Sequence, residues 1–147
     1  MSMYATLLIA AIALGAPAPK DPPKKVPSVV GLWEMESYTY AGTPRRLGVQ
    51  PVRYEFTADS KWISYRGERK TIERTYSTNP KADPPTIDLN YDPTEQNPPM
   101  GRGIFKVDGD TLTICLIRND EPRPTAFESA RGTATFLHVF KRVKPKD

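Results

Sequence analysis

The sequence predicts an all-β protein that folds as a single antiparallel β-barrel of about eight strands. First, apolar and polar residues alternate over short segments, which is typical of strands with one buried face. Second, no segment shows the apolar spacing of an amphipathic helix. Third, proline-rich stretches at 80–85, 93–99 and 122–124 separate the alternating segments as loops would. An even number of antiparallel strands closes naturally into a barrel, because closure removes the exposed edges of an open sheet.

Eight segments carry this pattern and are the expected strands. In the first of them, Trp33, Met35 and Ser37 occupy alternate positions and are expected to share one face, with Tyr38 on the other. The other seven are expected at residues 52–56, 61–65, 72–77, 87–91, 103–107, 111–117 and 136–143. A barrel of eight strands is either filled by its own side chains or holds one small ligand, and the sequence leaves both outcomes open.

Several aspartates lie at or near the expected turns and are interpreted as structural. Asp108-Gly109 is expected to join two strands in a tight hairpin, since both residues tolerate positive φ. Asp110 follows this glycine, where an aspartate side chain accepts hydrogen bonds from nearby backbone amides. Asp88 lies on the polar face of its strand, and Arg123 is its expected ion-pair partner. This interpretation is favoured over acid–base catalysis or Ca²⁺ binding, which require converging carboxylates.

A series of motifs follows in fixed order along the chain. They are Gly31-Leu32-Trp33, the Pro-x-x-Ile-Asp-Leu segment 84–89, the hairpin 103–115, the Arg-Pro-x-x-Phe loop 123–127 and Lys141-Arg142. On these motifs, the chain from about Val29 to Val143 resembles an uncharacterised domain family that is abundant in planctomycete-type bacteria, often behind an export signal. The resemblance implies a lipocalin-like β-barrel and brings no established activity with it.

A tryptophan on the first expected strand and an arginine on the last form a pair that is similar to one at the closed end of lipocalins. There, a basic residue at the end of the last strand covers the tryptophan of a Gly-x-Trp motif on the first. In this chain Gly31, Trp33 and Arg142 match that arrangement, and the guanidinium is expected to lie over the indole face. The alternative is that Trp33 is an ordinary core residue and Arg142 a solvated charge.

The chain is expected to hold one folded domain between two short terminal segments. Residues 1–18 contain an apolar run, at 4–14, that has the length of a signal-peptide core and is too short to span a membrane. Residues 19–28 are rich in proline and lysine and are expected to form an extended linker. The barrel domain is expected at 29–143 and a basic tail at 144–147.

The apolar run predicts an exported protein, periplasmic or extracellular, with no transmembrane segment after signal removal. No Lys or Arg precedes the run, so an N-terminal helix or a start site placed too early is the alternative. The mature N-terminus is expected between about Ala16 and Asp21. N-terminal sequencing of the protein from its own host distinguishes these outcomes.

The net charge of +4 and the pI near 9.2 do not predict a nucleic-acid partner. Residues 27–140 carry 14 Lys and Arg against 15 Asp and Glu, so the excess of positive charge lies in the two tails. Nucleic-acid binding requires a basic face on the folded domain that neutralises phosphates. The charge distribution argues against such a face.

The single cysteine and the single histidine predict no catalytic or metal chemistry. Cys115 has no second cysteine with which to form a disulfide, and it is interpreted as a small buried thiol. His138 shares a strand face with Phe136 and Phe140 and is expected to point into the barrel. No nucleophile with a base, metal-ligand cluster or phosphate loop accompanies these residues, so we expect no enzyme activity, no cofactor and no bound metal.

Two functions from different classes remain. The first is a non-catalytic binding module for a small apolar or amphipathic molecule. Its candidate ligand contacts are Tyr54, Trp62, Tyr76, Phe105, Arg123 and His138. The second is a protein-interaction domain of the cell envelope, with a barrel filled by Trp33, Phe56, Leu112 and Phe140. The presence or absence of an open interior separates the two.

Overall fold

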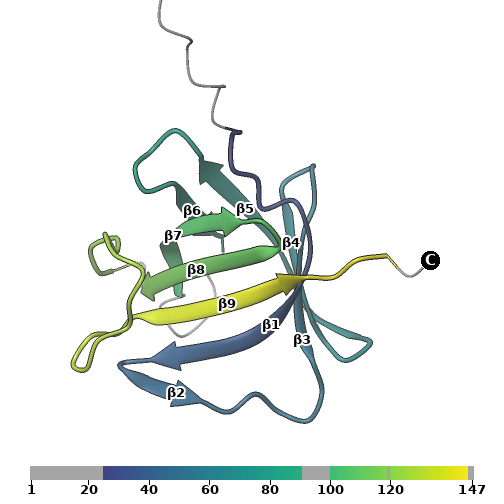
Figure 1. The fold of residues 1–147 in the computed structure, drawn as a ribbon, viewed down its shortest axis with the longest axis horizontal. Coiled ribbons are helices and arrows are strands. Elements are labelled where there is room, and N and C mark those ends of the chain that lie inside the picture. The colour runs from purple at the N-terminus through teal and green to yellow at the C-terminus, as the bar shows by residue number, and fades with distance from the viewer. Residues whose placement is uncertain (1–24, 91–99, 119, 146–147) are drawn as a thin grey trace, which may run out of the picture.

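The structure is a computed structural model, and it describes residues 25–90, 100–118 and 120–145. It is all-β and contains nine strands (Figure 1). They are β1 (Gly31–Tyr40), β2 (Thr43–Arg45), β3 (Val52–Phe56), β4 (Lys61–Arg66), β5 (Arg69–Asn79), β6 (Thr86–Leu89), β7 (Met100–Asp108), β8 (Thr111–Arg118) and β9 (Phe136–Arg142). Within the described ranges no helix is present that is long and apolar enough to cross a membrane.

The strands form one antiparallel sheet that closes on itself. Their order is β2-β1-β3-β4-β5-β6-β7-β8-β9, and β1 also pairs with β9. Eight strands therefore make a closed barrel, and β2 is an additional short strand that pairs with the second half of β1. The predicted all-β barrel of about eight strands is confirmed, and β2 is the element that the alternation did not reveal.

A β-bulge in β1 changes which of its side chains face the interior. The register with β9 shifts between Met35 and Ser37, so Glu36 has no counterpart in β9. The bulge reverses the alternation, because one extra residue turns every later side chain to the opposite face. Ser37 is exposed and Tyr38 packs against the core, so the predicted faces of these two residues were wrong.

The hairpin between β7 and β8 differs by one residue from the predicted turn. Asp108 pairs with Thr111, so the two-residue loop consists of Gly109 and Asp110. Gly109 occupies the first loop position with a φ of 59°, a left-handed conformation that favours glycine.

Large side chains from opposite walls fill the barrel from the end where β1 begins and β9 ends. We call this the closed end, and it lies on the right in Figure 1. The fully buried side chains that pack together inside include Trp33, Phe56, Trp62, Phe105, Leu112, Ile114 and Phe140. Val29, just before β1, joins this cluster, and its carbonyl accepts a hydrogen bond of 2.7 Å from Trp33 Nε1.

The loop between β8 and β9 packs on the outer face of the barrel. Cys115 lies beneath it, fully buried, with its Sγ 3.5 Å from the carbonyl oxygen of Glu128, and burial raises its pKa to about 11. The backbones of β7 and β8 approach closely here, since a Cβ on Gly103 would lie 2.2 Å from the Cys115 carbonyl oxygen. The thiol is thus a packing element on the outer wall.

Parts of the sequence prediction fall outside the described residues. The expected signal segment at 1–18 and residues 19–24 of the linker precede residue 25, whereas residues 25–28 of the linker are described and belong to no strand. The fifth predicted strand was drawn to residue 91, whereas β6 ends at Leu89 and residue 91 is not described.

Candidate ligand-binding site

A pocket of about 610 Å³ opens at the end of the barrel opposite the closed end. We call this the open end; the end of β1, the start of β3, the end of β4, the start of β5 and the start of β9 lie there, together with the loop between β2 and β3. The lining residues are Met35, Tyr38, Arg46, Leu47, Gly48, Val52, Tyr54, Ser64, Tyr65, Arg66, Thr71, Ile72 and His138. Most of the lining surface therefore comes from strand residues, which hold their side chains on a rigid scaffold.

The register of β3 with β4 stacks the pocket wall in layers. Val52 lies opposite Arg66 at the mouth and Tyr54 lies opposite Ser64 one layer deeper. Because side chains two positions apart in a strand share a face, Arg66 stands above the buried Ser64 on the inner face of β4. On β5, Ile72 pairs with Ser64 and completes this side of the wall. The wall is thus apolar and aromatic, with polar groups at two depths.

His138 supplies the polar group deep in the pocket. Its ring lies among aromatic rings, with centroids 5.9 Å from Tyr38, 6.3 Å from Tyr54, 5.8 Å from Phe136 and 6.0 Å from Phe140. The side chain is buried, and its Nδ1 has no hydrogen-bond partner among the described residues. Burial lowers the pKa of His138 to about 4, so the imidazole is neutral at pH 7.

Two arginines stand at the mouth of the pocket. Arg66 ends β4, and a Cβ on Gly48 would lie 3.5 Å from its Nη1, so its head group lies against the β2–β3 loop. Arg46 begins this loop. The loop is anchored to the β4–β5 turn, since the amide of Gly67 donates a hydrogen bond of 2.8 Å to the Pro51 carbonyl. Both arginines therefore line one entrance.

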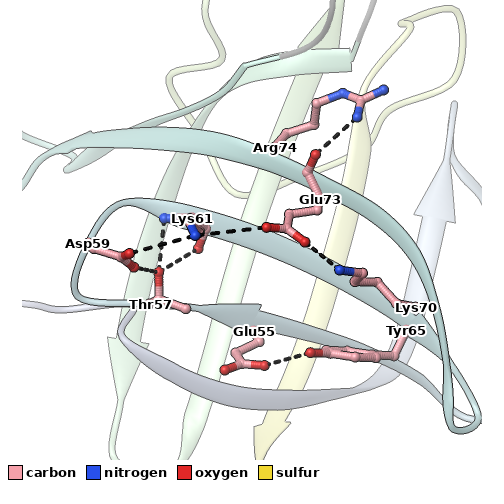
Figure 2. Close-up of polar contacts among 8 residues, drawn as sticks. All are labelled: Glu55, Thr57, Asp59, Lys61, Tyr65, Lys70, Glu73 and Arg74. Atoms are coloured by element: carbon pink, nitrogen blue, oxygen red, sulfur yellow. Dashed lines mark hydrogen bonds and ion pairs between the residues drawn. The ribbon is translucent and has the colours of Figure 1, made fainter.

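The arginines at the mouth carry no ion pair within the described part of the chain, and no carboxylate lines the pocket. The outer face of the same wall is different, as Figure 2 shows along β3, β4 and β5. There Lys61 lies 3.9 Å from both Asp59 and Glu73, and Lys70 pairs with Glu73. The outer charges are compensated, and the charges at the mouth are not.

Hydrogen bonds complete this outer network. The Thr57 hydroxyl bonds to Asp59 and lowers the pKa of that carboxyl, and Lys70 lowers the pKa of Glu73 in the same way. Tyr65 donates a hydrogen bond of 2.9 Å to Glu55 on the neighbouring strand. The outer carboxylates are thus bound to neighbours and exposed to solvent, which is typical of a structural surface network.

The sequence-predicted ligand contacts divide between the pocket, the core and the outer wall. Tyr54 and His138 line the pocket together. Trp62, Tyr76 and Phe105 do not line it; they are buried in the core, and the Tyr76 hydroxyl donates a hydrogen bond of 2.8 Å to the Thr57 carbonyl.

Arg123 lies away from the pocket, on the outside of the barrel. Its guanidinium lies 2.9 Å from Asp88 and donates hydrogen bonds to the carbonyls of Ile87 and Gly103, at 3.3 and 2.7 Å. These contacts tie the β8–β9 loop to β6 and β7. The expected pairing of Asp88 with Arg123 is therefore present, as a structural clamp.

The closed end contains the expected contact between Arg142 and Trp33. The guanidinium carbon of Arg142 lies 4.2 Å from the indole centroid, a distance typical of a cation–π contact. Asp110 holds the same guanidinium from the β7–β8 turn at 3.4 Å, and Lys144 lies 3.1 Å from the other Asp110 oxygen. At Gly31 a Cβ would lie 2.8 Å from Arg142 Nη1, so glycine leaves room for the arginine.

Sequence reasoning missed several residues of the pocket. Tyr38 was assigned to the outer face because nothing in the alternation reveals the bulge before it. Arg66 stands two positions after Ser64 and could have been found by extending the alternation of β4 by one residue. Arg46 and Leu47 lie in an irregular loop, where no periodicity exists to read.

No group of three or more His, Cys, Asp or Glu side chains is placed to hold a metal ion in the described ranges. Comparisons of the chain with family models, with curated proteins and with solved structures found no match. The resemblance to the planctomycete-type domain family thus stays a prediction from motifs, and the chemistry of the pocket carries the functional argument.

Proposed function

We propose that the protein is a non-catalytic binding module that takes a small apolar or amphipathic molecule into the open end of its barrel. The pocket carries this proposal: about 610 Å³ lies within the size range of small-molecule sites. Its walls combine apolar and aromatic side chains with a few polar groups, the usual composition of such sites. Because residues 1–18 carry the expected signal segment, we propose that the module works in the periplasm or outside the cell.

The pocket chemistry favours binding over catalysis. Ser64 and His138 both line the cavity, which invites comparison with a serine nucleophile and its base. No hydrogen bond joins the two side chains in the described structure, and the pKa of His138 near 4 makes its imidazole a weak base. A neutral, poorly basic histidine is suited to hydrogen bonding with a bound molecule.

The alternative function is a protein-interaction domain of the cell envelope, which predicts a filled barrel. Only the closed half of the interior fits this prediction. Trp33, Phe56, Leu112 and Phe140 are all fully buried there and belong to one packed cluster. The open half contains the pocket, and a barrel that served only as a scaffold would not need it. Binding of a small molecule is therefore the better-supported function.

The proposal is tested with N-phenyl-1-naphthylamine, a neutral aromatic probe whose fluorescence rises in apolar surroundings. We expect the full chain to bind the probe saturably. Ile72→Phe adds bulk at the pocket wall and should weaken binding by about tenfold, which corresponds to about 1.4 kcal/mol.

Thr111→Phe is the matched control, since Thr111 is exposed on β8 and does not line the pocket. This variant should keep the affinity of the unmodified protein. Absence of saturable binding, or equal weakening by the two substitutions, would contradict a binding site in the pocket.

A further inference from the structure

We propose that the molecule bound at the open end is a small amphipathic anion, whose oxyanion head group is held by Arg46 and Arg66 while its apolar body enters the barrel. The inference rests on the proposed binding function and specifies its ligand class. It is carried by the position of two guanidinium groups, without an ion pair among the described residues, at the mouth of a pocket whose walls include apolar and aromatic side chains.

The mouth of the pocket carries two positive charges. Arg46 and Arg66 line the entrance without an ion-pair partner in the part of the chain that the structure describes, and the pocket lining contains no carboxylate. A guanidinium presents planar donors that match a carboxylate, sulfonate or phosphate, often through two parallel hydrogen bonds. Two such groups at one entrance favour an anion.

Some arginines outside the pocket are held by carboxylates of the barrel itself. Arg53 pairs with Glu34 at 2.9 Å, Arg123 pairs with Asp88 and Arg142 with Asp110. In each case a carboxylate of the protein lies within 3.4 Å. Arg45, Arg69, Arg102 and Arg131 also have no ion pair among the described residues, so what distinguishes Arg46 and Arg66 is their position at a pocket whose lining contains no carboxylate.

The absence of formal charge among the described residues that line the inner part of the pocket sets the orientation of the ligand. The deep polar group of the pocket, His138, is uncharged at pH 7 and surrounded by aromatic rings. An anionic head placed at that depth would lose its hydration without meeting a formal charge. The head group therefore lies at the mouth, and the apolar body lies against Tyr38, Tyr54 and Ile72.

His138 then serves as a hydrogen-bonding group for the inner part of the ligand. Its buried Nδ1 lacks a partner within the described ranges, and a buried polar atom without a hydrogen bond is costly. A hydroxyl, amide or carbonyl on the ligand body would satisfy it. The proposed ligand is thus an anion whose apolar body carries at most a few polar groups.

The experiment compares two probes that share one aromatic skeleton. 8-Anilinonaphthalene-1-sulfonate carries a sulfonate that the neutral N-phenyl-1-naphthylamine lacks. We expect the full chain to bind the sulfonate about tenfold more tightly than the neutral probe. Arg46→Gln and Arg66→Gln should each lower the affinity for the sulfonate by about tenfold and that for the neutral probe by less than about twofold.

Arg102→Gln is the matched control, because Arg102 is an exposed strand arginine that does not line the pocket. It should leave both affinities unchanged. Decanoate should displace either probe at lower concentration than decanol, which extends the result from a sulfonate to a carboxylate.

The outcomes distinguish the two proposals. Equal affinity for the two probes, or arginine variants that weaken both probes alike, would overturn the anionic head group and leave the binding function standing. An equal loss of sulfonate binding in Arg102→Gln would also overturn it, since attraction to general surface charge would then explain the result. Failure of both probes to bind would overturn the inference together with the binding function.

Discussion

The two ends of the barrel use the same kinds of residue in opposite ways. At the closed end, an aromatic ring and an arginine satisfy each other, with Arg142 4.2 Å from the Trp33 indole and 3.4 Å from Asp110. At the open end, aromatic side chains such as Tyr54 line a cavity, and Arg66 stands at its mouth without an ion pair to any described residue. The difference teaches that one barrel holds a tightly packed end and an end with a cavity, and that the same residue types serve both.

Core substitutions should reveal this difference most strongly. Leu112→Ala removes a fully buried side chain from the cluster and should lower the free energy of unfolding by about 3 kcal/mol. Ile72→Ala removes a partly exposed side chain that already borders the cavity and should cost about 1 kcal/mol. Urea unfolding monitored by Trp fluorescence measures both. Similar losses would mean that the open end is packed as tightly as the closed end.

The next largest expected effect is a loss of stability in acid, caused by His138 at the open end. The pKa of His138 is about 4 in the folded protein and about 6.5 when exposed, so between these values the unfolded chain binds more protons. Stability due to this group is therefore lost as the pH falls from 6.5 toward 4. We expect a loss of about 2 kcal/mol between pH 7 and pH 5.

His138→Phe is the matched variant, because Phe keeps a ring between Phe136 and Phe140 and does not titrate. Carboxylates with lowered pKa, including Asp59 and Glu73, also favour unfolding in acid, but they are present in both proteins. The difference between the two urea profiles isolates the histidine. Identical dependence on pH in both would show that folding does not lower the pKa of His138.

The smallest effects belong to the charges of the closed end. Arg142→Ala loses the contact with the indole and the packing of its aliphatic chain, and should cost about 1–2 kcal/mol. Arg142→Lys should recover only part of this, since an ammonium has no planar face. Lys144→Ala should cost less than about 0.5 kcal/mol, because Lys144 pairs with Asp110 in an exposed position. Equal urea midpoints for the two alanine variants would refute a closing role for Arg142.

Alternation in the sequence predicted the strands better than it predicted the pocket. It predicts whether a side chain points in or out, which is why Trp62, Tyr76 and Phe105 were expected inside the barrel, where they lie. It carries no information on depth along the barrel axis, which depends on the register between strands. Tyr54 and His138 lie at the level of the pocket, and the other three candidates are packed into the core.

Two further features of the site could not be predicted from the alternation of apolar and polar residues, each for its own physical reason. The bulge at Glu36 reverses the faces of β1 through a single unpaired residue, and the local composition does not signal it. The loop that carries Arg46 has no period, and its place at the mouth follows from tertiary contacts such as that between Gly67 and Pro51. The position of a residue in an irregular loop is set by the tertiary contacts of that loop.

The hydrogen bond from Trp33 to Val29 holds the segment before β1 at the closed end. Strand β9 ends at Arg142, so the chain also leaves the barrel at this end. The segments before β1 and after β9 thus both join the barrel at the end opposite Arg46 and Arg66. A protein immobilised on a sensor surface through either terminal segment would present its entrance to the flowing solution. The segments that leave the barrel and the mouth of its pocket thus lie at opposite ends of the molecule.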